Sequence, residues 1–160
     1  MAGSTKQWIV PQAFGTAIYE GVSSCIVCSI GWGTTEWLIV NNGKPTWGKS
    51  DDMAVSHIVS ETDKTGADYV NREIFKNPDT KKAKEELVEN ILYNYKKITM
   101  KEKKSYSLIF SGGGILVPGI EGLFYKNNLK FDVSKDPVNA NAIGMKMHAK
   151  KMGEKEHTTS

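Results

Sequence analysis

Residue types that can hold an anion gather in the turn Ser29-Ile30-Gly31-Trp32-Gly33-Thr34-Thr35-Glu36, which lies between the apolar runs 25–28 and 37–40. Glycine has no Cβ, so Gly31 and Gly33 allow the backbone to approach a bulky anion, and the hydroxyls of Thr34 and Thr35 add hydrogen-bond donors. This chemistry favours a phosphate group. Taken alone, the stretch fits an ordinary glycine-containing hairpin equally well.

A second glycine-rich turn, Ser111-Gly112-Gly113-Gly114, follows the apolar stretch 106–110 and precedes a helix that we predict over 118–125. A strand that runs into glycines and then into a helix is how α/β proteins build nucleotide sites at strand ends. The glycine triplet by itself also fits a simple loop that enters a helix.

The stretch from Gly43 to Ser50 fits the pattern GxxxxGK[ST] of P-loop nucleotide-binding proteins, with Lys49 at its conserved lysine position. Several features speak against that interpretation. Pro45 removes one backbone amide, Trp47 is bulky, and the Asn-Gly step at 42–43 predicts a hairpin turn instead. A P-loop NTPase that uses Lys49 and Ser50 therefore remains a third hypothesis.

Cysteine and histidine residues give no sign of metal or redox chemistry. Cys25 and Cys28 form a CxxC pattern, but positions three apart in a strand point to opposite faces, so we predict two buried core thiols. His57, His148 and His157 are scattered without ligand spacing. We assign no catalytic residue and no metal ligand.

The elements that position these turns follow a simple order along the chain. A helix between Val10-Pro11 and Gly21 precedes three antiparallel strands over 25–49. Further predicted elements are helices over 65–75 and 80–98, a strand over 106–110, a helix over 118–125, a strand over 129–133 and a last helix over 137–151, with Ala140, Ile143, Gly144 and Met147 on its inner side. This order predicts an α/β fold: a mixed sheet with three leading antiparallel strands and helices on its faces.

Composition fits one globular domain. The chain has 160 residues, 39% hydrophobic and 24% charged, with a net charge of +3 that is too small and dispersed to indicate nucleic-acid binding. It lacks an apolar stretch long enough to span a membrane and an export signal, so we expect a cytoplasmic protein. We assign residues 1–152 to the domain and 153–160 to a disordered tail.

Read together, the Val-Pro helix, the glycine-threonine turn, the glycine triplet with Val117-Pro118-Gly119 and the stretch 136–144 resemble the actin-like ATPases. This superfamily includes actin, sugar kinases and heat-shock chaperones, and the archaeal and plasmid-segregation actin homologues are the most similar members. The resemblance covers about residues 9–148 and corresponds to the C-terminal lobe only. It implies a ribonuclease H-like domain.

The resemblance also implies a site for ATP or ADP with magnesium. Its phosphate-binding residues are Gly31, Trp32, Gly33, Thr34 and Thr35, and its adenosine-binding residues are Gly112, Gly113, Gly114, Pro118, Arg72 and Glu73. The implied partners are the nucleotide and either further copies of the chain or a protein that supplies the first lobe.

Two departures from the family bear on catalysis. The first lobe is missing, and Ser29 stands where the family usually has an aspartate that organises the magnesium ion. A neutral hydroxyl is a poor ligand for a hard cation. We therefore expect a nucleotide-binding lobe of a filament-forming ATPase that is inactive alone. The alternative is a non-catalytic interaction module that keeps the fold.

Overall fold

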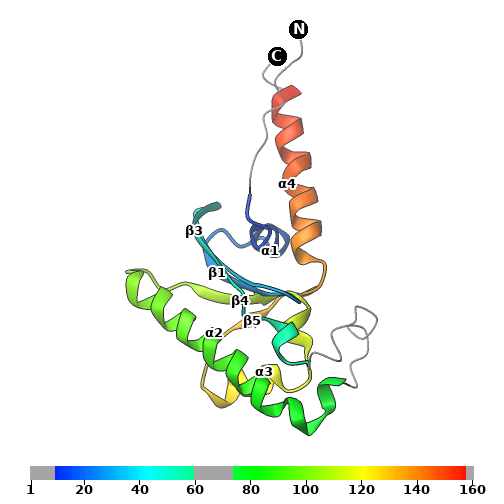
Figure 1. The fold of residues 1–160 in the computed structure, drawn as a ribbon. Helices are drawn as coiled ribbons and strands as arrows, with labels where there is room; N and C mark the ends of the chain where they lie inside the picture. Colours follow the sequence, from blue (N-terminus) through cyan, green and yellow to red (C-terminus); the bar gives the residue numbers. More distant parts are fainter. Residues whose placement is uncertain (1–9, 60–73, 158–160) are drawn as a thin grey trace.

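The computed structural model describes residues 10–59 and 74–157, and its centre is a five-stranded mixed sheet in the order β3-β2-β1-β4-β5 (Figure 1). Strands β1 (Cys25–Ile30), β2 (Thr35–Asn41) and β3 (Lys44–Asp51) form an antiparallel meander. Strands β4 (Ser107–Ser111) and β5 (Asp132–Val133) continue the sheet parallel to β1. The predicted α/β class and the three leading antiparallel strands are confirmed.

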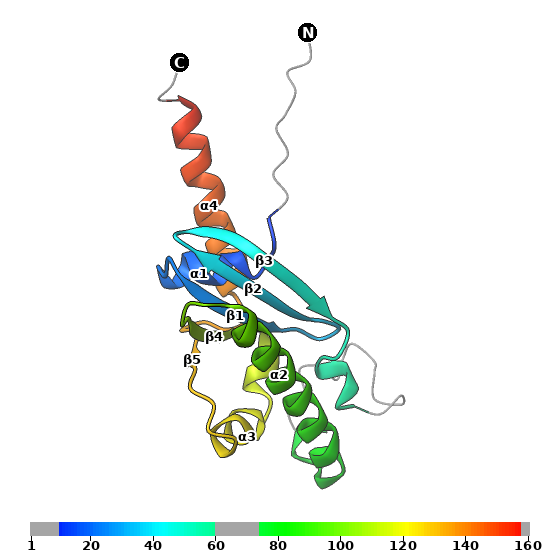
Figure 2. The ribbon, with the colours of Figure 1, turned by 90° about the vertical axis from the view of Figure 1, so that its left-hand side faces the viewer.

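Helices cover both faces of the sheet (Figures 1 and 2). Helices α1 (Phe14–Glu20) and α4 (Ala140–His157) lie on one side, and α2 (Lys81–Lys101) and α3 (Ile120–Lys126) lie on the other. The central strand β1 is buried along its whole length because both faces are covered. Four short 3-10 helices complete the described elements: η1 (Val55–His57), η4 (Ile74–Lys76), η5 (Pro78–Thr80) and η6 (Gly113–Leu116).

The two cysteines show how β1 divides the core. Cys25 packs in the apolar cluster under α1, whereas Cys28 packs in the larger cluster under α2 and α3. Both thiols are free and fully buried, as predicted. Burial raises the pKa of Cys25 to about 11 and also raises the pKa of Cys28, because a thiolate loses hydration in the core.

Several boundaries differ from the prediction. Helix α4 runs from Ala140 through His157, whereas the sequence predicted the last helix over 137–151. Strand β5 has only two residues, Asp132 and Val133, where the sequence predicted a strand over 129–133. Most of the helix predicted over 65–75 lies outside the described residues. The division into one domain over 1–152 and a tail stays a prediction.

The inner face of α4 differs from the one predicted, because α4 crosses α1 at close range (Figure 1). A Cβ on Gly144 would lie 1.8 Å from the carbonyl oxygen of Gly15, so the two helices meet backbone to backbone. Only small residues fit such a contact, and Gly15 of α1 and Gly144 of α4 form it. Ala140 is buried, as predicted. Ile143 and Met147, predicted to face inward, are 38% and 49% exposed.

Within the described ranges, no helix combines the length and the apolar composition needed to cross a membrane.

Candidate functional site

Both glycine-rich turns lie at the same end of the sheet. Strands β1 and β4 are parallel neighbours, and Ser29 near the end of β1 pairs with Ser111 at the end of β4. The turn 31–34 follows β1, and the triplet 112–114 follows β4. The carboxyl ends of parallel strands are where open α/β sheets bind ligands. The structure therefore brings together two motifs that are about 80 residues apart in the sequence.

The first turn is fixed by its own bonds and by the segment after β3. The N–H of Gly31 donates to the carbonyl oxygen of Thr34 at 2.9 Å. The carbonyl of Trp32 accepts from the N–H of Ser56 at 2.9 Å, and the Gly31 carbonyl accepts from Val55 at 3.3 Å. The turn is thus held before any ligand arrives, which lowers the ordering cost of binding.

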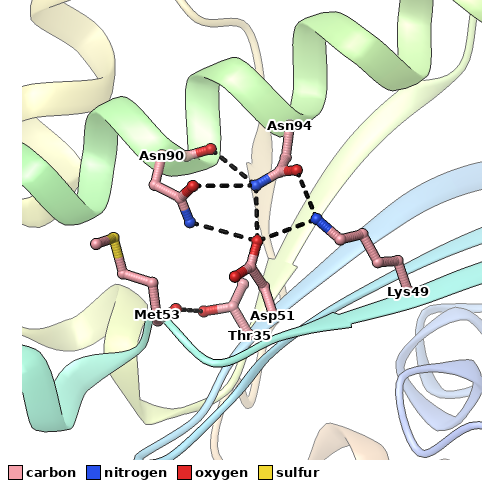
Figure 3. A network of polar contacts seen from close by, with 6 residues as sticks. All are labelled: Thr35, Lys49, Asp51, Met53, Asn90 and Asn94. Carbon is pink, nitrogen blue, oxygen red and sulfur yellow. Dashed lines mark hydrogen bonds and ion pairs between the residues drawn. The ribbon is translucent and has the colours of Figure 1, made fainter.

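Thr35 has a structural role that the sequence did not indicate. Its hydroxyl donates to the carbonyl oxygen of Met53 at 2.8 Å, and the residue is only 1% exposed (Figure 3). This bond fastens the start of β2 to the end of β3. The Thr35 hydroxyl is therefore engaged inside the protein, and its assignment as a phosphate ligand remains a prediction.

Gly33 and Thr34 are the open part of the turn. Both are exposed, and neither of their N–H groups donates a hydrogen bond to another described residue. A Cβ built on Gly33 would meet no atom of the described residues within 4 Å, and the φ of Gly33 is not in the left-handed region. Two adjacent N–H groups beside empty space can donate to the oxygens of an anion.

The glycine triplet serves mainly to bring the two turns together. Gly112 has φ +81°, and a Cβ there would lie 2.2 Å from the carbonyl oxygen of Ile30. A Cβ on Gly114 would lie 2.2 Å from Cγ2 of Ile30 and 2.8 Å from Cγ2 of Val55. The N–H of Gly112 donates to the carbonyl of Pro137 at 2.7 Å. The space that these two glycines leave is filled by protein.

The remaining adenosine-binding candidates are four residues, of which the structure describes two. Gly113, the middle glycine of the triplet, begins η6, and Pro118 lies just before α3; both are partly exposed. Arg72 and Glu73 lie outside the described residues. The adenosine site thus stays a prediction, centred on Gly113 and Pro118 in the described part of the chain.

Ser29 is part of a buried hydrogen-bond chain that joins α1, α4 and β1. The hydroxyl of Thr16 donates to Oδ1 of Asn141 at 2.6 Å, and Nδ2 of Asn141 donates to the Ser29 hydroxyl oxygen at 3.0 Å. Ser29 is 7% exposed. Sequence reasoning missed Asn141 because its partners lie more than 100 residues away.

The residues present do not fit direct coordination of magnesium at this turn. Where the family usually has a carboxylate, Ser29 offers a hydroxyl that already accepts a bond from Asn141. Among residues 10–59 and 74–157, no group of three or more histidine, cysteine, aspartate or glutamate side chains is arranged to hold a metal ion.

The P-loop hypothesis is wrong. Residues 44–51 form the edge strand β3, and Asn42 and Gly43 form the hairpin turn before it, both with positive φ. A phosphate loop must instead wrap the anion and lead directly into a helix. Lys49 donates to Oδ2 of Asp51 at 3.2 Å and to Oδ1 of Asn94 at 3.0 Å.

Asp51 is the centre of a polar network between β3 and α2 (Figure 3). Its Oδ2 accepts from Lys49, from Nδ2 of Asn94 at 2.9 Å and from Nδ2 of Asn90 at 3.5 Å. Burial opposes ionisation, but the bonds and charge of Lys49, the Asn90 amide and the Met53 N–H outweigh it and hold the pKa of Asp51 below its ordinary value. This network fixes α2 against β3.

The sequence matches no protein-family model and no curated protein. Solved structures do match it. One is ethanolamine utilization protein EutJ from Carboxydothermus hydrogenoformans, which is 18% identical over 84% of this chain and 53% of its own, with a TM-score of 0.65. The archaeal actin homolog Ta0583 is 21% identical over 89% of this chain and 55% of its own, with a TM-score of 0.67.

A third match is MreB 5 of Spiroplasma citri bound to AMPPNP, 17% identical over 93% of this chain and 61% of the other, with a TM-score of 0.60. The chain thus spans little more than half the length of these three proteins. At such identities the likeness concerns the fold. The chain has the fold of one lobe of the actin-like ATPases, with the mixed sheet of a ribonuclease H-like domain.

Proposed function

We propose that this chain binds ATP or ADP at the turn 31–34, as the C-terminal lobe of an actin-like protein. The observation that carries the proposal is the pair of open N–H groups at Gly33 and Thr34, beside the carboxyl ends of two parallel strands. Their surroundings leave room for a phosphate group. A neighbour in fold, MreB 5, was solved with the nucleotide analogue AMPPNP.

In this proposal the turn binds phosphate through its backbone. The N–H groups of Gly33 and Thr34 donate to phosphate oxygens, with the Thr34 hydroxyl and the residue Trp32 beside them. Gly113 and Pro118 lie next to the adenosine. A magnesium ion would neutralise charge on the phosphates. Since Ser29 stands where the family usually has a carboxylate, we propose that the ligands of this ion come from the nucleotide, from water or from another protein.

Hydrolysis needs more than this lobe. Rates of phosphoryl transfer depend on donors and cations on several sides of the phosphates, and this chain supplies one side. We propose that the lobe is inactive alone in the cytoplasm and that a first lobe, supplied by another chain or another part of the protein, completes the cleft. Self-association into filaments belongs to the same proposal.

A second candidate is a non-catalytic interaction module. The bond between Ser29 and Asn141 favours it, because the position that organises metal in the family here joins two helices and a strand. In that case the fold is kept for binding other proteins.

Calorimetric titration of ATP and ADP, each with and without magnesium, tests the nucleotide proposal. The informative variant is Gly33→Val, because its side chain enters open space at an ordinary φ and removes the room for phosphate. Gly122→Val on α3 is the matched control, since Gly122 also has nothing within 4 Å. We expect affinity at least about tenfold weaker in Gly33→Val, or about 1.4 kcal/mol, and unchanged in the control.

Two results would overturn this proposal. One is the absence of any binding heat with the folded chain, which leaves the interaction module as the better candidate. The other is equal affinity of Gly33→Val and the unaltered chain, which would place the nucleotide away from the turn.

A further inference from the structure

A groove of about 340 Å³ runs between strand β3 and helix α2. It is lined from Trp47 to Asp51 along the strand and from Asn90 to Glu102 along the helix, with Ile39 and Ile98 in its apolar part. None of the described residues of the predicted phosphate and adenosine sites lines it. The groove is therefore a second candidate site, separate from the glycine turns.

Two aromatic side chains in the groove are unusually open to solvent. Trp47 is 41% exposed and Tyr93 is 56% exposed, and Nζ of Lys97 lies 4.4 Å from the centre of the Tyr93 ring. Exposed aromatic residues beside cations are typical of binding surfaces, because they bury a large apolar area with little loss of side-chain freedom.

The groove opens beside an unpaired sheet edge. Strand β3 is the last strand on its side of the sheet within the described residues, and Figure 2 shows this strand uncovered along its outer edge. Pro45 and the irregular pairing near Val40 interrupt the start of the strand, but Trp47 to Asp51 pair regularly with β2. Alternate residues of this regular part direct their N–H and C=O groups outward, where a further strand can bind them.

Charge indicates the kind of strand that fits. Lys97 and Lys101 line the groove, and no carboxylate pairs with either in the described part of the chain. Asp51 is already paired with Lys49 at 3.2 Å. Glu102 follows α2 and also lines the groove, and Lys103 and Lys104 come directly after it, so the cations at that end outnumber the carboxylate.

A second copy of this chain is a poor occupant. If two β3 strands paired, each copy would bring Lys44, Lys49 and Asp51 to the shared edge, so both strands would carry a net positive charge and the pair would lack charge complementarity. A strand with acidic side chains would instead place opposite charges next to these lysines, which is stabilising. Charge complementarity therefore selects a different protein with an acidic extended segment.

We propose that the groove binds an extended acidic segment of a partner protein, which adds as a strand to the edge of β3 and places acidic side chains beside Lys97 and Lys101. Because successive side chains of a strand point to opposite faces of the sheet, the methylene groups of the same acidic side chains pack on Trp47 and Tyr93, and the intervening side chains point away from the groove. Backbone bonds to β3 supply affinity, and the lysines and aromatic rings supply selectivity. This function goes beyond nucleotide binding and does not depend on it.

The probe is a fluorescent short peptide in which glutamate alternates with valine, and binding is measured by anisotropy. Lys97→Glu reverses a charge inside the groove. Lys96→Glu makes the same change on the neighbouring residue, which is exposed and does not line the groove. We expect Lys97→Glu to weaken binding by about tenfold or more and Lys96→Glu by no more than about twofold.

A second peptide tests the strand geometry. N-methylation of its alternate amides removes the bonds to β3 while its charges stay, so binding should be lost. The proposal is overturned if the methylated peptide or a helical acidic peptide binds as tightly, if Lys96→Glu weakens binding as much as Lys97→Glu, or if the first peptide does not bind the folded chain at all.

Discussion

Gly112 provides the sharpest test of how the two glycine turns are joined. Replacing it with alanine has two separate costs. Gly112 has φ +81° and ψ 159°, a backbone conformation that essentially only glycine adopts, and a non-glycine residue there costs about 1–3 kcal/mol. The new Cβ would also lie 2.2 Å from the carbonyl oxygen of Ile30 on the central strand, and overpacking of this kind costs about 1–3 kcal/mol. We expect a total loss of about 2–6 kcal/mol in the free energy of unfolding.

Gly21 offers the matched control for Gly112. It lies in the left-handed region, at φ +69° and ψ 25°, and a Cβ there would meet no atom of the described residues within 4 Å, so Gly21→Ala carries only a backbone cost of about 1–2 kcal/mol. Urea unfolding followed by tryptophan fluorescence gives both free energies, and buried Trp37 reports on the core. Gly112→Ala should cost at least about 1 kcal/mol more than Gly21→Ala, which is the lower end of the overpacking cost. Equal destabilisation would refute the inference that the second turn packs tightly on the end of β1.

Three further predictions concern the rest of the chain. Gly144→Ala should destabilise the protein strongly by separating α1 from α4, whereas Gly153→Ala, with open space around it, should stabilise α4 by up to about 1 kcal/mol; thermal unfolding compares the two. Because the pKa of Asp51 is lowered in the folded state, its contribution to stability is present above its unfolded pKa and lost as the pH falls through its folded pKa, so the destabilisation by Asp51→Asn should disappear in acid titrations below about pH 4. Cys25 and Cys28 should resist a thiol reagent at pH 8 until the protein unfolds, because both are buried and the pKa of each is raised; rapid labelling of the native protein would contradict this.

The sheet was predictable from the sequence because its signals are local. The runs 25–30 and 35–41 are apolar and bounded by glycine or asparagine, so their hairpin follows from composition and turn chemistry. The strand predicted over 129–133 was too long because hydrophobicity alone does not show where β4 stops offering partners. Only Asp132 and Val133 pair with it.

The roles of single side chains were less predictable because they depend on distant contacts. The sequence marks Gly112 as a glycine beside a strand, but it does not show that Ile30 fills the space of its absent side chain. Asn141 appears polar within a helix, and its two partners are 125 and 112 residues away. The functional assignment of a glycine thus needs the structure, because a glycine required for packing and one required for ligand access are indistinguishable in the sequence.

This distinction between packing and ligand access bears on the proposed nucleotide site. Gly112 and Gly114 are glycines because of protein packing. The N–H groups left to bind an anion are therefore those of Gly33 and Thr34 in the first turn, which are exposed to solvent. Water screens an anion that is held on one side only, and each bond to it is correspondingly weak. If the proposed function is right, a protein that covers the other side of the turn should increase nucleotide affinity and should itself bind more tightly when nucleotide is present, because the two couplings are thermodynamically equal.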